Sequence, residues 1–82
     1  IMRVLVVEDE VMLAEQVKNQ LEQQQFSVDL AHDGSDGLFK LTEYPYDLAI
    51  IDLGLPKLDG LSLIRKARQQ EVKTPIIVLT AR

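Results

Sequence analysis

The chain has 82 residues, of which 46% are hydrophobic and 27% are charged, and this composition is typical of one small folded domain rather than of a disordered segment. A net charge of −4 repels phosphate backbones and argues against nucleic-acid binding by the domain itself. With no cysteine and no apolar run approaching the ~20 residues of a membrane span, we expect no disulfide, thiol site or membrane segment, and a cytoplasmic protein.

Four short apolar segments rich in β-branched residues alternate with segments of helical periodicity. The predicted strands are Arg3–Val7, Ser27–Ala31, Leu48–Asp52 and residues 76–80. The first, third and fourth are nearly continuous apolar runs, as in strands covered on both faces, whereas the second alternates like an edge strand. Parallel pairing is therefore expected.

The first two predicted helices lie between these strands. In residues 11–24, Leu13, Val17 and Leu21 recur every four residues and predict one buried face. The second helix is expected to open at Asp33 and to end before Pro45, which cannot continue it.

The third predicted helix covers residues 60–70, and Asp59 can cap it. Its inward residues are predicted to be Leu61, Ile64 and Ala67. The order β-α-β-α-β-α-β indicates the α/β class: one flavodoxin-like parallel sheet with helices on both faces. We expect strand order 2-1-3-4, without the fifth βα unit of such folds, which does not occur in residues 1–82.

Polar residues follow three of the predicted strands. Glu8 and Asp9 follow the first, Asp52 ends the third, and Thr80 and Ala81 end the fourth. The carboxyl ends of parallel strands share one edge, where open α/β sheets bind their ligands. We therefore expect these residues to converge.

Converging carboxylates from Glu8, Asp9 and Asp52 would repel one another by ~4 kcal/mol per pair at 4 Å and an effective dielectric constant near 20. Either some of them are protonated or a cation lies among them. Mg²⁺ is the cation that such a site suits best, because it takes carboxylates together with waters and phosphoryl oxygens.

Beside a metal, an oxygen of Asp52 can act as a nucleophile. A phosphoryl group there would find donors in the Thr80 hydroxyl and in the backbone amides of Gly54 and Ala81.

Taken singly, these residues have plainer interpretations. The acids after the first strand can form the first turn of a helix, with Asp9 as its cap. His32, the only histidine, is expected to be an exposed loop residue. The run "DGSDG" at 33–37 superficially suggests a calcium loop, but it lacks the glutamate at the twelfth position.

Taken together, the motifs resemble response-regulator receiver domains of bacterial two-component signalling. They are "VVEDE" after the first strand, "IIDLGLPKLDG" around Asp52, and "VLTAR" at the end. The resemblance covers the whole chain. It is closest to the winged-helix transcription-factor subfamily, in particular to regulators that answer magnesium or cationic-peptide sensor kinases.

The resemblance implies that Asp52 accepts a phosphoryl group from a sensor histidine kinase. It implies that Mg²⁺ is held by Glu8, Asp9, Asp52 and the Gly54 carbonyl, and that the Thr80 hydroxyl turns onto the phosphate as a switch. Such a domain catalyses only its own phosphotransfer and dephosphorylation. DNA would be contacted only through a C-terminal output domain, which does not occur in residues 1–82.

Receivers also carry a lysine after strand five and an aromatic switch residue on it, and neither occurs in residues 1–82. Loss of one such donor costs ~2.7–4 kcal/mol, so we expect this chain to be phosphorylated poorly or not at all. Strand 76–80 is expected to be an open edge through which the chain self-associates.

Two other functions are considered. A dehalogenase-type phosphatase also uses an aspartate after a buried strand, but it needs an acid two residues later, where this chain has Gly54. The second is a receiver that is not phosphorylated and acts only as an interaction or assembly module.

Overall fold

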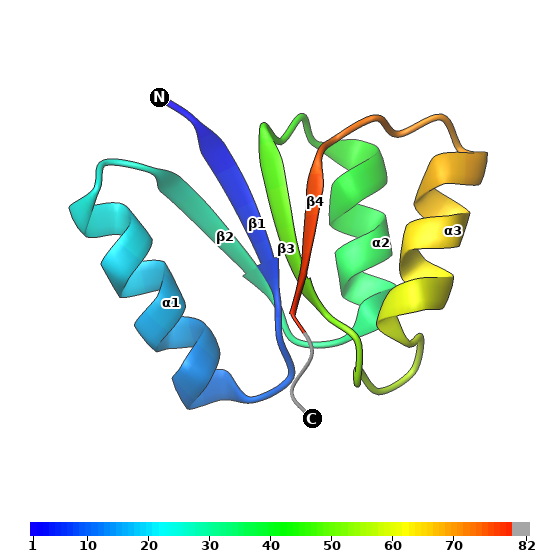
Figure 1. The fold of residues 1–82 in the computed structure, drawn as a ribbon, viewed down its shortest axis with the longest axis horizontal. Coiled ribbons are helices and arrows are strands. Elements are labelled where there is room, and N and C mark those ends of the chain that lie inside the picture. Colours follow the sequence, from blue (N-terminus) through cyan, green and yellow to red (C-terminus); the bar gives the residue numbers. More distant parts are fainter. Residues whose placement is uncertain (80–82) are drawn as a thin grey trace.

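The computed structural model describes residues 1–79, in which strands and helices alternate strictly (Figure 1). The elements are β1 (Arg3–Val7), α1 (Val11–Gln23), β2 (Ser27–Ala31), α2 (Gly34–Glu43), β3 (Leu48–Asp52), α3 (Gly60–Gln69) and β4 (Ile76–Leu79). The predicted α/β class and element order are confirmed. Within the described range no helix is long and apolar enough to cross a membrane.

The four strands form one parallel sheet in the predicted order β2-β1-β3-β4. Val7 is in register with both Ala31 of β2 and Ile51 of β3, and Asp52 is in register with Leu79 of β4. All four arrows therefore point to the same edge of the molecule (Figure 1). This register brings the carboxyl ends of β1 and β3 side by side.

Each face of the sheet has its own apolar core. Alternate β1 residues, Val4 and Val6, pack with Val28 beneath α1. The intervening residues Leu5 and Val7 belong to a larger core on the opposite face, which α2 and α3 cover (Figure 1). Because β1 is covered on both faces, its continuous apolar run is explained.

Two predictions of helix faces were partly wrong. In α1 the buried residue is Ala14, with Val17 and Leu21 partly buried, while Leu13 is exposed. In α3 Leu63 and Ala67 are buried, and Leu61 is 58% exposed. Leu13 and Ala14 are neighbours in α1, and Leu61 and Leu63 are two residues apart in α3, so periodicity alone allowed more than one apolar stripe in each helix.

The predicted helices 11–24 and 60–70 are each one residue shorter in the structure. After α1, Gln25 takes a left-handed backbone conformation with φ of 70°. After α3, Glu71 does the same with φ of 65°. Each left-handed residue turns the chain out of the helix, and the residue before it therefore caps the helix.

Strand β4 is not covered on both faces, contrary to the prediction from its apolar sequence. Ile76 packs against the α2–α3 core, but Ile77 is 50% exposed and Val78 and Leu79 are also exposed. The reason is position, because β4 is the outermost strand of the sheet formed by residues 1–79 and pairs only with β3. The predicted residue Thr80 lies outside the described residues.

Candidate functional site

Three carboxylates meet where β1 and β3 end. One carboxylate oxygen from each of Glu8, Asp9 and Asp52 lies within 4.8 Å of those from the other two. Glu8 and Asp52 are buried, with exposed fractions of 7% and 4%, whereas Asp9 is exposed. The structure thus brings together the three acids that were predicted from the sequence to converge. The other two predicted site residues, Thr80 and Ala81, lie outside the described residues.

Glu8 is held by main-chain contacts on both sides. Its amide donates to the Ala31 carbonyl at 2.9 Å, which extends the β1–β2 ladder by one bond. Its carboxylate oxygen Oε2 accepts from the Glu10 amide at 3.0 Å. This second bond turns the Glu8 side chain back across the end of its own strand, toward Asp52.

Asp9 does not cap the following helix, contrary to the plainer interpretation of its position. The N-cap residue of α1 is Glu10, and its side chain makes no capping hydrogen bond. Asp9 lies one residue earlier, where its carboxylate belongs to the cluster with Glu8 and Asp52. The acidic run therefore serves the edge of the sheet rather than the helix start.

Asp52 is the last residue of β3 and points out of the strand into the cluster. The Gly54 amide donates to its Oδ1 atom at 3.4 Å, so Gly54, which was predicted to be a site residue, lies beside the carboxylate. Gly60, the first residue of α3, packs directly on the Asp52 backbone. A Cβ atom at Gly60 would lie 2.5 Å from the Asp52 carbonyl oxygen, so only glycine allows α3 to begin this close to the site.

The loop that follows β3 is fastened to α2. The Lys57 ammonium lies 3.5 Å from the carboxylate of Asp33, the N-cap of α2. Lys57 has a left-handed φ of 69°, and the next residue, Leu58, lies against Gly34. A Cβ atom at Gly34 would collide with the Leu58 carbonyl oxygen. The loop after Asp52 is therefore packed between the starts of two helices.

The electrostatics of the cluster are unfavourable when all three carboxylates are ionised and no cation is bound. Burial raises the pKa of Glu8 above its ordinary value, and the negative charges of Asp9 and Asp52 raise it further, against the lowering effect of the Glu10 amide. The ion pairs formed by residues 1–79 involve other acids: Asp29, Asp36 and Asp33.

The donor set fits a small hard cation. Mg²⁺ takes oxygen ligands and is usually held by one or two carboxylates, with waters completing its shell. The carboxylate oxygens that lie within 4.8 Å of one another provide such ligands. Two of these oxygens belong to buried side chains that have no cationic partner in the described chain, and a bound cation would stabilise these two most. Glu8, Asp9 and Asp52 are the residues that would hold the ion.

His32 is not the exposed loop residue that the sequence suggested. Its side chain is partly buried, and Nδ1 lies 2.9 Å from the Glu8 carbonyl oxygen. A histidine two residues before a glycine in a polar loop carries no signal for this contact, because the contact depends on β2 ending beside β1. Only the sheet order, once known, would have placed His32 next to the acids.

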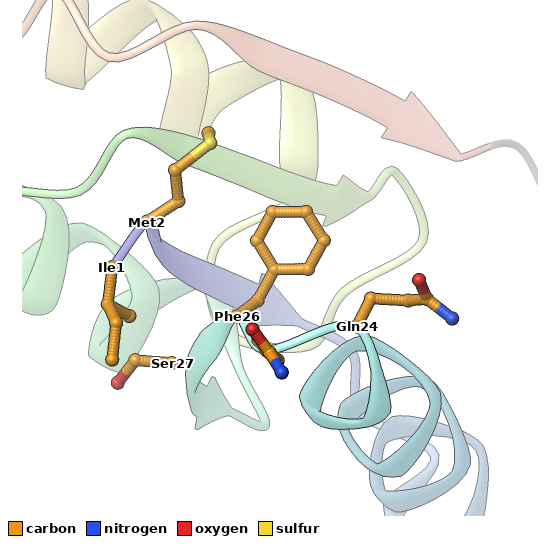
Figure 2. A pocket seen from close by; sticks show the side chains of 6 residues that line it. Ile1, Met2, Gln24, Phe26 and Ser27 are labelled. Carbon is orange, nitrogen blue, oxygen red and sulfur yellow. The ribbon is translucent and has the colours of Figure 1, made fainter.

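Two surface hollows lie away from the acids. One, of about 650 Å³, is formed by the start of β1 and the turn between α1 and β2 (Figure 2). Its lining residues are Ile1, Met2, Gln24, Gln25, Phe26 and Ser27, none with a charged side chain. The other lies beside Arg68 and Lys73 at the end of α3. Neither contains a cluster of groups suited to metal binding or phosphoryl chemistry, so the acidic edge remains the candidate site.

Comparison with known proteins identifies the class. The family described as "Response regulator receiver domain" matches residues 4–82, and the chain belongs to this family. The receiver domain of the Francisella response regulator 1452 is 36% identical with a TM-score of 0.95, over 99% of this chain and 67% of that one. The fold and the motifs thus agree on a receiver.

Individual relatives indicate which kinds of response regulator this chain is similar to. The virulence transcriptional regulatory protein PhoP of Salmonella typhimurium is 51% identical over 81 residues, 99% of this chain. The chain spans 36% of the length of that relative. Similarity to PhoP is consistent with the predicted winged-helix subfamily. The response regulator TrrA of Thermotoga maritima, solved in complex with Mg²⁺-BeF, is 34% identical with a TM-score of 0.93, over 100% of this chain and 71% of that one.

Proposed function

We propose that this chain is the phosphoacceptor part of a response regulator, in which Asp52 receives a phosphoryl group in a magnesium-dependent reaction. The observation that carries the proposal is the cluster of Glu8, Asp9 and Asp52, two of them buried and none paired with a cation among residues 1–79. The TrrA relative was solved with Mg²⁺-BeF, and this supports the same ligand class here.

Each site residue has its own role in the proposed phosphotransfer. Asp52 supplies the attacking carboxylate oxygen, and burial at the end of β3 holds that oxygen in one place. Glu8 and Asp9 orient the cation, with the Gly54 carbonyl as a further proposed ligand. When bound, Mg²⁺ neutralises the negative charge that carboxylates and phosphoryl oxygens bring together. The Gly54 and Ala81 amides and the Thr80 hydroxyl are proposed to bind the phosphoryl oxygens, with Thr80 as the switch.

Residues 1–82 are proposed to be the N-terminal part of a single receiver domain. Its phosphodonor would be a sensor histidine kinase, as is general for receivers. The relative PhoP is named a transcriptional regulatory protein, and this chain spans 36% of it. By analogy the output would be transcription, with DNA contacted by a C-terminal domain. Catalysis would be confined to the domain's own phosphorylation and dephosphorylation.

The test is to incubate the chain with acetyl phosphate and to locate the adduct by mass spectrometry. The expected modified fraction is low, because the lysine that receivers supply after strand five does not occur in residues 1–82. The adduct is expected on Asp52, only when Mg²⁺ is present, and never in Asp52→Asn. An adduct on another residue, or one that forms equally in EDTA, would contradict the proposal.

A second candidate function, an assembly module, is favoured by the outer edge of β4. Ile77, Val78 and Leu79 are exposed there, and their outward main-chain groups pair with no strand among residues 1–79. Such an edge is a template for another strand. We infer that the 82-residue chain self-associates through it.

Light scattering across a concentration series tests this second function. The expected result is a mass that rises with concentration in the wild-type chain and stays monomeric in Val78→Lys, since a charged residue blocks edge pairing. Lys73→Glu, a charge change before β4, is the matched control and should associate like wild type. A wild-type chain that stays monomeric throughout would overturn this inference. Absence of any Asp52 adduct, together with association, would favour the assembly module over the phosphoacceptor.

A further inference from the structure

We propose that His32 is a positioning residue for the magnesium site: its ring holds the main chain that carries the Glu8 and Asp9 carboxylates. The inference rests on the proposed function, because it concerns the same three acids. It adds a residue from β2's side of the sheet to a site otherwise built from β1 and β3.

The contact has a defined direction. Nδ1 of His32 lies 2.9 Å from the Glu8 carbonyl oxygen. A carbonyl oxygen only accepts hydrogen bonds, so Nδ1 must carry the hydrogen and donate. The neutral ring is therefore the Nδ1–H tautomer, and its Nε2 atom has no hydrogen. This tautomer is a testable property of the metal-free chain.

The ring continues the sheet past the end of β2. The β1–β2 register ends with Val7 opposite Ala31, and the Glu8 amide then donates to the Ala31 carbonyl. Strand β2 stops at Ala31, yet the Glu8 carbonyl still receives a donor, from the His32 ring. The imidazole thus replaces the main-chain donor that a longer strand would supply.

The hydrogen bond from His32 affects the positions of Glu8 and Asp9, the two candidate metal ligands that follow β1. The Glu8 carbonyl belongs to the peptide that joins Glu8 to Asp9, so a bond to this oxygen fixes the plane from which the Asp9 side chain projects. Glu8 itself is then held at its amide, its carbonyl and its carboxylate. Mutual repulsion of Glu8, Asp9 and Asp52 favours opening of the cluster, and a fixed peptide opposes that opening.

Two variants separate positioning from simple packing. In His32→Ala the donor is lost, and we expect Mg²⁺ to bind about tenfold more weakly, in the range found when outer contacts of metal ligands are removed. In His32→Asn the Nδ2 atom lies as many bonds from the backbone as Nδ1 of histidine, so it can donate to the same carbonyl. We expect its Mg²⁺ affinity to stay within about threefold of wild type.

The affinities are measured by following backbone amide shifts during a Mg²⁺ titration, with urea unfolding in EDTA as a check on the fold. Weak binding in His32→Ala with rescue in His32→Asn supports the inference. Wild-type affinity in His32→Ala, or equal loss in both variants, overturns the inference alone while the proposed function stands. A wild-type chain that binds no Mg²⁺ overturns both.

A nitrogen-15 spectrum of the imidazole in the metal-free chain provides an independent readout. The Nδ1–H tautomer is expected, with the hydrogen on Nδ1 protected from exchange with solvent. The Nε2–H tautomer would overturn the inference, because Nδ1 would then have no hydrogen to donate.

Discussion

The two ends of the sheet treat negative charge in opposite ways. Near the amino ends of β1 and β3, the Asp29 carboxylate lies 3.3 Å from the Arg3 guanidinium and accepts from the Tyr46 hydroxyl at 2.7 Å. The Arg3 guanidinium also lies 5.3 Å from the centre of the Tyr46 ring. Burial and this hydrogen bond raise the pKa of Tyr46, so its proton stays in place. The charges of Asp29 and Arg3 therefore compensate each other.

At the carboxyl end the acids are more buried and less compensated. Asp29 keeps 44% of its side chain exposed although it is paired, whereas Glu8 and Asp52 are almost fully buried and form no ion pair in the described chain. Selection for stability alone would not produce this distribution, because a buried unpaired charge is strongly destabilising. The amino-end cluster is therefore structural, whereas the carboxyl-end cluster needs a proton or a bound cation to offset its charges.

The largest expected effect comes from breaking the compensated end. Asp29→Ala removes the acceptor of the partly buried Tyr46 hydroxyl together with the partner of Arg3, and it should lower the free energy of unfolding by about 2 kcal/mol, within the range for an unsatisfied donor. Urea denaturation measures it. In a Tyr46→Phe background the same substitution should cost clearly less, because no hydroxyl is left unsatisfied. Equal losses in both backgrounds would show that the hydroxyl bond is not what Asp29 contributes.

The next effect has the opposite sign and concerns the uncompensated end. Asp52→Asn keeps the acceptor for the Gly54 amide but removes one charge from the cluster, so in EDTA it should stabilise the chain by about 1 kcal/mol, a fraction of the pair repulsion. The matched control is Asp29→Asn, which loses only an exposed ion pair and should destabilise by about 0.5 kcal/mol. If both amides destabilise, the proposed contrast between the two ends fails.

The smallest effect is a pH dependence from Glu8. Because its pKa is raised in the folded chain, the folded state binds this proton more tightly than the unfolded state does. Stability from Glu8 is therefore complete below its ordinary pKa of 4.5 and is lost as pH rises through the raised value. Urea midpoints in EDTA should fall over this window in wild type and less in Glu8→Gln.

Two other acids provide the control for the sign of this effect. The amide of Asp36 lowers the pKa of Asp33, and that of Ser62 lowers the pKa of Asp59. Their contributions are present above the ordinary value of 3.8 and are lost as pH falls below it, so they do not overlap with the window of Glu8. If the urea midpoints of Glu8→Gln depended on pH in the same way as those of wild type, this pH dependence could not be assigned to Glu8.

The sequence was sufficient for the sheet and for the meeting of the acids. Continuous apolar runs identify strands β1 and β3 because both faces of each are covered, and the order of a parallel α/β sheet then brings Glu8 and Asp52 to one edge. The caps Asp33 and Asp59 were also identified correctly, and each accepts from an amide three residues later. These features depend on local patterns or on general rules of topology.

Features that depend on tertiary contact were not predictable. Leu61 and Leu63 are equally apolar, and only docking of α3 against Asp52 through Gly60 determines that Leu63 is buried. His32 looks like a polar loop residue until β2 is placed beside β1. The apolar composition of β4 did not indicate that its faces are exposed, although the predicted strand order correctly placed β4 at an edge of the sheet.

The central claim, that the Glu8, Asp9 and Asp52 cluster is a magnesium site, is tested most directly by thermal unfolding of the metal-free chain during a Mg²⁺ titration. We predict saturable stabilisation of wild type with an affinity in the millimolar range, amounting to about 1.4 kcal/mol at ten times the dissociation constant. Asp52→Asn should show little stabilisation by Mg²⁺, although it is the more stable protein in EDTA. Equal stabilisation of both proteins, or of neither, would contradict the claim.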